Sequence, residues 1–195
     1  MMNRPTTDTS DGKKPGGEFD PWTNRLSRDV RNTLSESFML ALSRMEPSAY
    51  RDEADIWRTK NLSDIYLEYI QDRLQRYDRV IEQIKAQHLD DPLLQSLPIW
   101  NNGLFFEFHD HLEGIWMQAA GDERQALKGM IKAAAVYAHH EYNHEAAIKS
   151  LSVKSYDLVQ QYSDCLAFIK NLDVLAQKLK TLDPDPPRLE NPALQ

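Results

Sequence analysis

The chain has 195 residues, of which 41% are hydrophobic, and a formal net charge of −7. This is enough apolar material for one domain with an extension. The negative charge, with no basic cluster beyond Lys13-Lys14, argues against a nucleic-acid-binding surface. The single cysteine, Cys165, excludes an internal disulfide and fits a reducing cytoplasm. No apolar run approaches the roughly 20 residues that cross a bilayer, and the polar N-terminus lacks a secretory signal. A cytoplasmic protein with no membrane partner is therefore expected.

The first 90 residues predict a polar segment followed by helices. Residues 1–19 are rich in Thr, Ser, Asp, Lys and Gly, which is typical of a disordered N-terminus. Residues 20–90 form the expected N-terminal helical half, because apolar residues recur there every three or four positions. The expected helices run from Pro21, after an Asp20 cap, to just before Pro47; from Ser48 over a shorter length; and from Ser63 to about His88.

The remainder predicts a second helical bundle over residues 97–182. Residues 90–98 are expected to form a loop, with or without one helical turn, because Asp90-Asp91-Pro92 interrupts the apolar periodicity. The helices expected beyond it run from about Trp100 to Gln118, from Asp122 to Tyr142, from His144 towards Tyr162, and from Ser163 to Leu182, the last either continuous or broken near Asn171. Asn143 is expected to end a helix in a left-handed conformation. The proline-rich tail, residues 183–195, is expected to be extended and mobile.

No segment shows the alternation of a β-strand, and no internal repeat is present. The sequence thus predicts an all-α fold: a multi-helix bundle with a helical N-terminal extension and disordered termini.

The segment from Asn101 to Trp116 combines aromatic residues with metal-capable side chains. On a helix, His109 and Glu113 are four residues apart and share a face, and Trp116 continues their row. This spacing predicts that both polar groups point into the core, whereas Glu107 and Asp110 point elsewhere. Burying histidine and glutamate costs free energy unless each finds a partner. The pair is therefore the candidate site.

A metal at this site needs a further ligand, which the next helix offers. The short link at residues 119–122 makes the two helices antiparallel neighbours, so His140, or alternatively His139, could join. His109, Glu113 and His140 are the candidate metal ligands, and zinc, iron or manganese suits imidazole and carboxylate. Without a metal, His109 and Glu113 are candidate catalytic residues as an acid/base pair. Neither the zincin His-Glu-x-x-His pattern nor the Glu-x-x-His pair of di-iron bundles is present here.

Residues about 97–152 resemble the bacterial and archaeal domain-of-unknown-function family 309. The family pattern reads Asn-x-Gly, two aromatics, Glu, one residue, then His-Glu-x-x-Glu-x-x-Trp. The chain matches it at Asn101, Gly103, Phe105, Phe106, Glu107, His109, Glu113 and Trp116, and more loosely at Gly129, Ile131, Ala134, Asn143 and Ala147. It departs from the family at Asp110 (Glu), Lys132 (Gln), and Tyr142 and Ala146 (both Gly). The resemblance implies an all-helical fold and leaves the activity undefined, because the family is itself uncharacterised.

Two functional hypotheses follow. In the first, the protein is a structural or interaction module, in which His109, Glu113 and Trp116 form a buried cluster that fixes helix register. A second copy or a protein partner would bind through the N-terminal helices. In the second, it is a metal-dependent, hydrolase-like enzyme that uses His109 and Glu113. Three ligands around a solvent-accessible point would favour the enzyme, and a sealed cluster would favour the module.

Overall fold

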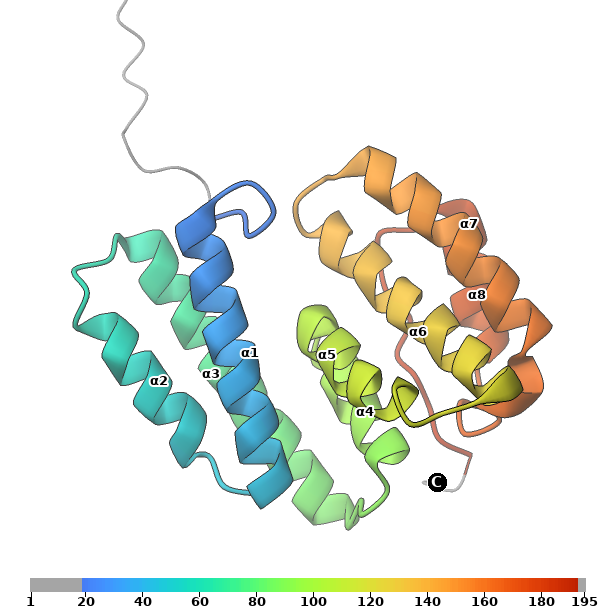
Figure 1. Ribbon diagram of the computed structural model, residues 1–195, viewed down its shortest axis with the longest axis horizontal. Coiled ribbons are helices and arrows are strands. Elements are labelled where there is room, and N and C mark those ends of the chain that lie inside the picture. Colours follow the sequence, from blue (N-terminus) through green and yellow to red (C-terminus); the bar gives the residue numbers. More distant parts are fainter. Residues whose placement is uncertain (1–18, 193–195) are drawn as a thin grey trace, which may run out of the picture.

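The computed structural model describes residues 19–192, which fold into eight α-helices and one 3₁₀ helix with no strand in that range (Figure 1). The predicted all-α, multi-helix fold is confirmed. In chain order the elements are α1 (Arg25–Arg44), α2 (Ser48–Arg58), α3 (Asp64–Gln87), α4 (Pro92–Asn101), α5 (Phe105–Trp116), α6 (Gly121–His140), α7 (Glu145–Gln161), η1 (Ser163–Leu166) and α8 (Leu172–Thr181). The disorder predicted for the N-terminus lies, apart from Phe19, outside the described residues.

Helices α1–α3 form an N-terminal half with its own aromatic core. Phe38 of α1 stacks on Tyr77 of α3 with ring centroids 4.3 Å apart, and Tyr50 of α2 meets Tyr77 edge-on. Helix α1 begins four residues later than predicted. Asn24 is the residue that caps it, through a hydrogen bond from the Ser27 backbone N–H.

The loop predicted for residues 90–98 is wrong, because α4 occupies most of that segment. The carboxylate of Asp91 accepts a hydrogen bond from the Leu93 backbone N–H, and Pro92 stands at the first helical position, so the apparent break is a helix start. The single helix predicted from Trp100 to Gln118 is instead divided at Gly103. This glycine has a φ of +68°, and a Cβ there would lie 2.8 Å from Nη1 of Arg76.

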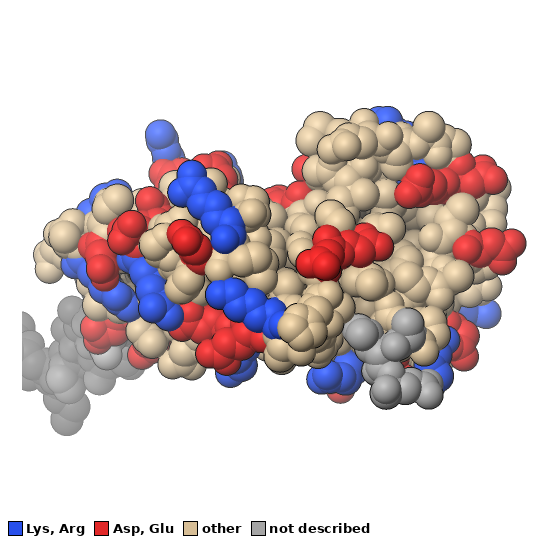
Figure 2. All heavy atoms as spheres, turned by 90° about the horizontal axis from the view of Figure 1, so that it is seen from below, with Lys and Arg blue, Asp and Glu red and all other residues tan. Residues whose placement is uncertain are grey.

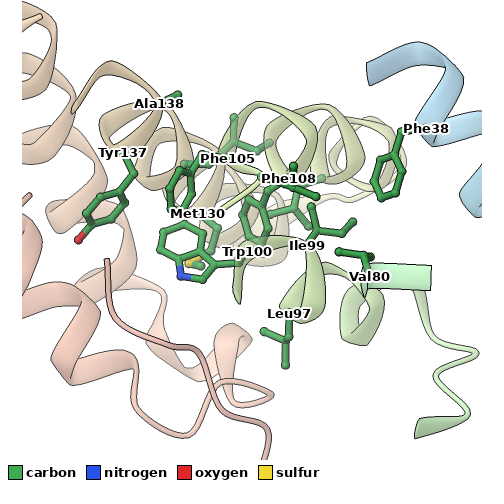
Figure 3. Packing of buried hydrophobic residues seen from close by; sticks show 14 of the residues in the cluster. Phe38, Val80, Leu97, Ile99, Trp100, Phe105, Phe108, Met130, Tyr137 and Ala138 are labelled. Carbon is green, nitrogen blue, oxygen red and sulfur yellow. The ribbon is translucent and has the colours of Figure 1, made fainter. Parts of the chain in front are cut away.

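The core of the second half is centred on Trp100 of α4. Its ring meets Phe105 and Phe108 of α5 edge-on, with centroids 5.1 Å away in each case (Figure 3). Its indole N–H donates to the Pro187 carbonyl, and Leu189 in the C-terminal segment is buried. The tail up to residue 192 is therefore extended, as predicted, but it is packed onto α4 rather than free.

Helices α4 and α5 lie between the N-terminal half and α6–α8 (Figure 1). Helix α5 thus has neighbours on two sides, which determines the environment of the candidate site. On the face seen in Figure 2, acidic and basic side chains are mixed over the N-terminal half, and the opposite end shows separate acidic groups on a mostly uncharged surface. Within residues 19–192, no helix has the length and apolarity needed to cross a membrane.

Candidate functional site

Helix α5 buries a different set of residues from the one predicted. Its buried side chains are those of Phe105, Glu107, Phe108 and Leu112. The prediction that His109 and Glu113 are embedded in the core is wrong: their side chains are 30% and 51% exposed. The prediction assumed one buried face. Because the N-terminal half covers a second side of α5, the buried arc is wider and displaced by about one residue, or roughly 100°.

The exposed side of α5 carries three potential metal ligands. His109, Asp110 and Glu113 each offer one ligand atom, and these atoms lie within 4.8 Å of one another. Nδ1 of His109 is 3.4 Å from Oδ1 of Asp110, and Nε2 is 3.9 Å from Oε1 of Glu113. Nδ1 is buried and has no hydrogen-bond partner among the described residues. The other Asp110 oxygen, Oδ2, accepts a hydrogen bond of 2.7 Å from the Ser35 hydroxyl of α1. The N-terminal half therefore fixes the orientation of Asp110.

His140 does not join this group, contrary to prediction. The α6 residues that face His109 and Glu113 lie between Lys128 and Ala135. Since a helix advances about 1.5 Å per residue, His140 lies roughly 7.5 Å further along α6 than Ala135. Its Nε2 is buried without a hydrogen-bond partner in the described chain, and burial lowers its pKa. The third member of the group is instead Asp110, which was predicted to point away.

His139 belongs to a separate contact with the N-terminal segment. Its ring stacks on Trp22 with centroids 4.0 Å apart, and its Nδ1 lies 3.1 Å from Nδ1 of His144. The other nitrogen of His144, Nε2, is 3.3 Å from Oδ2 of Asp20. Burial, followed by the charges of His144 and Arg31, lowers the pKa of His139. This histidine pair ties the segment before α1 to the turn after α6.

An open pocket of about 270 Å³, here called the α5 pocket, adjoins the candidate ligands. It is lined by His109, Glu113, Trp116, Lys128, Ile131, Lys132, Ala135 and Leu151. The guanidinium of Arg124 lies 4.0 Å from the centre of the Trp116 ring and covers it. Burial, followed by the charges of Lys128 and Lys154, lowers the pKa of Lys132. The pocket is thus lined by two lysines of α6 and by two of the three potential metal ligands, His109 and Glu113, whereas Asp110 lies outside its lining.

A second polar group, here called the sealed cluster, consists of Glu107, Tyr77, Arg73 and Arg31. Glu107 is fully buried, and its Oε1 accepts a hydrogen bond of 2.6 Å from the Tyr77 hydroxyl. Burial, together with the negative charge of Glu107, raises the pKa of Tyr77 well above its usual range. Arg73, also buried, donates to Glu141 and to the Gly103 carbonyl. The Arg31 guanidinium lies 3.7 Å from the centre of the Phe106 ring. Both arginines also interact electrostatically with Glu107. Tyr77 and Arg73 come from α3, and Arg31 comes from α1.

Several other residues of the predicted motif have structural roles. The Asn101 amide exchanges two hydrogen bonds with the Leu189 backbone and holds the C-terminal segment. Phe105 packs on Trp100, whereas Phe106 lies beneath Arg31. Asn143 has a φ of +56° in the turn between α6 and α7, so its predicted left-handed conformation is confirmed. None of these residues faces the α5 pocket.

The sequence analysis missed the two buried arginines of the sealed cluster. A signal was available, because Arg73 stands three residues after Ile70 and four before Tyr77, on the buried row of α3. Arg31 similarly lies four residues before the buried Ser35 on α1. A cation on an apolar row indicates a buried anionic partner, although it does not say which one.

Residues 93–151 match the model of a domain of unknown function, DUF309. The resemblance predicted from the sequence is thereby confirmed for this segment, which runs from α4 into α7 and contains both α5 and the α6 side of the pocket. The N-terminal half lies outside the match. No curated protein and no solved structure matches the chain.

Proposed function

We propose that the α5 pocket binds a divalent ion of zinc, iron or manganese through His109, Asp110 and Glu113, and that the protein is a metal-dependent, hydrolase-like enzyme. The observation that carries this proposal is the approach of three ligand atoms to within 4.8 Å beside an open pocket. Three protein ligands leave a coordination position for water, which is typical of catalytic zinc sites and not of structural ones. A metal-bound water with a pKa near 7 supplies a nucleophile at neutral pH.

The spacing of His109 and Asp110 supports this assignment. With metal–ligand distances of about 2.0–2.1 Å, two ligand atoms on a tetrahedral ion lie roughly 3.4 Å apart. Nδ1 of His109 and Oδ1 of Asp110 are 3.4 Å apart, and Nδ1 has no competing hydrogen bond from any described residue. Ser35 holds the second Asp110 oxygen, as outer-shell groups do for ligating carboxylates. Glu113 is half-exposed, so its side chain is free to complete the set.

Elemental analysis of the untagged protein, followed by calorimetric titration of the metal-free protein with zinc and manganese, tests the proposal. Near-stoichiometric metal is expected, and Asp110→Asn and Glu113→Gln should each lose it. His140→Ala is the matched control, because this histidine lies beyond the pocket. A wild-type protein that takes up no metal contradicts the proposal. So does a protein whose metal is lost in His140→Ala and kept in Asp110→Asn.

The second candidate is an interaction module that associates through the N-terminal helices. It is supported by apolar side chains that α1 and α2 leave exposed, with Leu40 at 43% and Ile56 at 52%. Light scattering of the full chain should then give the mass of a dimer, and Ile56→Glu should return it to a monomer. A monomer at every concentration contradicts self-association. The cytoplasmic location and the lack of nucleic-acid partners remain predictions from composition.

A further inference from the structure

Two lysines of the α5 pocket have no acidic partner within residues 19–192. Lys128 and Lys132 stand one turn apart on α6, and no carboxylate of residues 19–192 lies within 4.0 Å of either ammonium group. The chain has 30 acidic and 23 basic residues, so carboxylates are not scarce. Like charges four residues apart destabilise a helix. An anion bound between these two lysines would remove that repulsion.

The charge on the α5 side of the pocket determines whether an anion can enter. Glu113, which lines the pocket, and Asp110, whose Oδ1 is 3.4 Å from Nδ1 of the lining residue His109, would repel it in the metal-free protein. A divalent ion on the ligands proposed above balances these two carboxylates and leaves the two lysines as the excess charge. The complementary ligand is a dianion. A phosphate monoester carries a charge of about −1.5 to −2 at neutral pH and presents three strong acceptor oxygens, and lysine is a common phosphate-binding residue.

The size and remaining lining of the pocket restrict the rest of the ligand. Its volume of about 270 Å³ falls just below the roughly 300–1,000 Å³ of pockets that take drug-sized molecules. Beside the charged groups, Ile131, Ala135 and Leu151 give it an apolar floor. This combination fits a small organic group attached to a single phosphate.

We propose that the α5 pocket takes a small phosphate monoester, whose phosphate is held by Lys128 and Lys132 next to the metal. The inference rests on the metal site of the proposed function and adds the substrate class to it. The lysines line the pocket from α6, and His109 and Glu113 line it from α5, so the phosphate would contact both helices.

Calorimetric titration of the full-length, manganese-loaded protein with phenyl phosphate tests the inference. We expect saturable binding that Lys128→Gln and Lys132→Gln each weaken by about tenfold, the usual effect of losing one charged hydrogen bond. Lys85→Gln is the control, because this exposed lysine of α3 does not line the pocket. Phenol, which has the ring and lacks the phosphate, should not bind. Because both lysines are at least partly exposed, the variants should fold, which their thermal unfolding checks.

The same titrations separate the two proposals. If manganese binds normally but phenyl phosphate does not, or if the lysine variants bind it like the wild type, the substrate inference is overturned and the metal site stands. If no metal binds and phenyl phosphate still depends on both lysines, the metal proposal fails and the phosphate subsite stands. Where both hold, phenyl phosphate should tighten manganese binding by the same factor that manganese tightens phenyl phosphate binding.

Discussion

Two glutamates on one helix have opposite environments. Glu107 is fully buried in the sealed cluster and receives a hydrogen bond from Tyr77. Glu113, less than two turns further along α5, is half-exposed in the α5 pocket, where its Oε1 lies 3.9 Å from Nε2 of His109. The difference arises from what covers each side of α5. Helices α1 and α3 cover the side that carries Glu107, and nothing in the described chain closes the side that carries Glu113.

These two environments suit different roles: the buried carboxylate stabilises the fold, and the exposed carboxylate is available to bind a ligand. A buried carboxylate with fixed partners specifies how two parts of a protein pack, and its removal leaves those partners uncompensated. An exposed carboxylate contributes little to stability and remains free to bind a ligand. The N-terminal half, which lies outside the family match, thus turns one side of α5 into protein interior. Ser35, which belongs to the same N-terminal half, also orients Asp110, a proposed metal ligand on the other side of α5.

The largest expected effect comes from breaking the sealed cluster. Glu107→Ala should lower the free energy of unfolding by about 3–5 kcal/mol, because it leaves the Tyr77 hydroxyl unpaired and removes a negative charge that stabilises the buried Arg73. Urea unfolding monitored by circular dichroism measures the loss. Glu107→Gln, which keeps the shape and an acceptor oxygen, should lose less. Equal losses in the two variants would mean that the negative charge, and not the shape or the acceptor oxygen, stabilises this position.

A smaller loss is expected for Tyr77→Phe, which keeps the ring packed on Phe38. Oε2 of Glu107 already lacks a hydrogen-bond partner among the described residues, so the variant leaves the whole carboxylate without one. The expected cost is about 1–3 kcal/mol in urea unfolding. Tyr50→Phe is the matched control.

The control removes a bond of the same 2.6 Å length, from the Tyr50 hydroxyl to Asp78. Asp78 is partly exposed and stays paired with Arg51, so Tyr50→Phe should cost less than Tyr77→Phe. The reverse order would show that the carboxylate of Glu107 is not sealed from water.

The sequence predicted the long helices well, because their apolar spacing is strong. Helices α1, α3, α6 and α7 begin and end within a few residues of prediction. Helix α4 was missed for a physical reason: all five residues from Ser96 to Trp100 are buried, so no exposed face creates periodicity. Asp91-Pro92 was interpreted as a break, although the same pair is typical of a helix start.

The candidate site was predictable only in part. Helical spacing correctly made His109 and Glu113 neighbours, because that relation is local. The side of α5 on which they lie depends on α1 and α3, and local spacing does not reveal their position. The orientation of Asp110 likewise depends on Ser35, which is 75 residues away. Such long-range contacts leave no mark in the spacing of a single sequence.

A weaker effect is expected from pH, through the histidine contact that ties the N-terminal segment to the turn after α6. The pKa of His139 is lowered in the folded protein, mainly by burial and also by His144 and Arg31, against an opposing effect of Asp20. The unfolded chain therefore binds the proton more readily. The stabilisation is complete above the ordinary pKa of 6.5 and is lost as pH falls below it. The urea concentration at the unfolding midpoint should thus be higher at pH 7.5 than at pH 5.

The variant His139→Asn should reduce this pH dependence. The comparison must be between variants, because the pKa of Glu141 is raised, mainly by desolvation, and this acts in the opposite direction. His88→Asn is the control: His88 is exposed and ends α3 with a φ of +52°, a conformation that asparagine tolerates. If His139→Asn and His88→Asn show the same dependence on pH as the wild type, protonation of His139 does not weaken the contact.

The smallest effect on stability is expected for Glu113→Ala in the metal-free protein. The side chain is half-exposed and its distance to His109 is 3.9 Å, so the change in unfolding free energy should stay within about 0.5 kcal/mol. Adding manganese should raise the thermal midpoint of the wild type and not that of the variant, because a ligand stabilises only the state that binds it. A loss as large as that of Glu107→Ala would place both glutamates in one structural role. It would remove the distinction between a sealed side and an open side of α5.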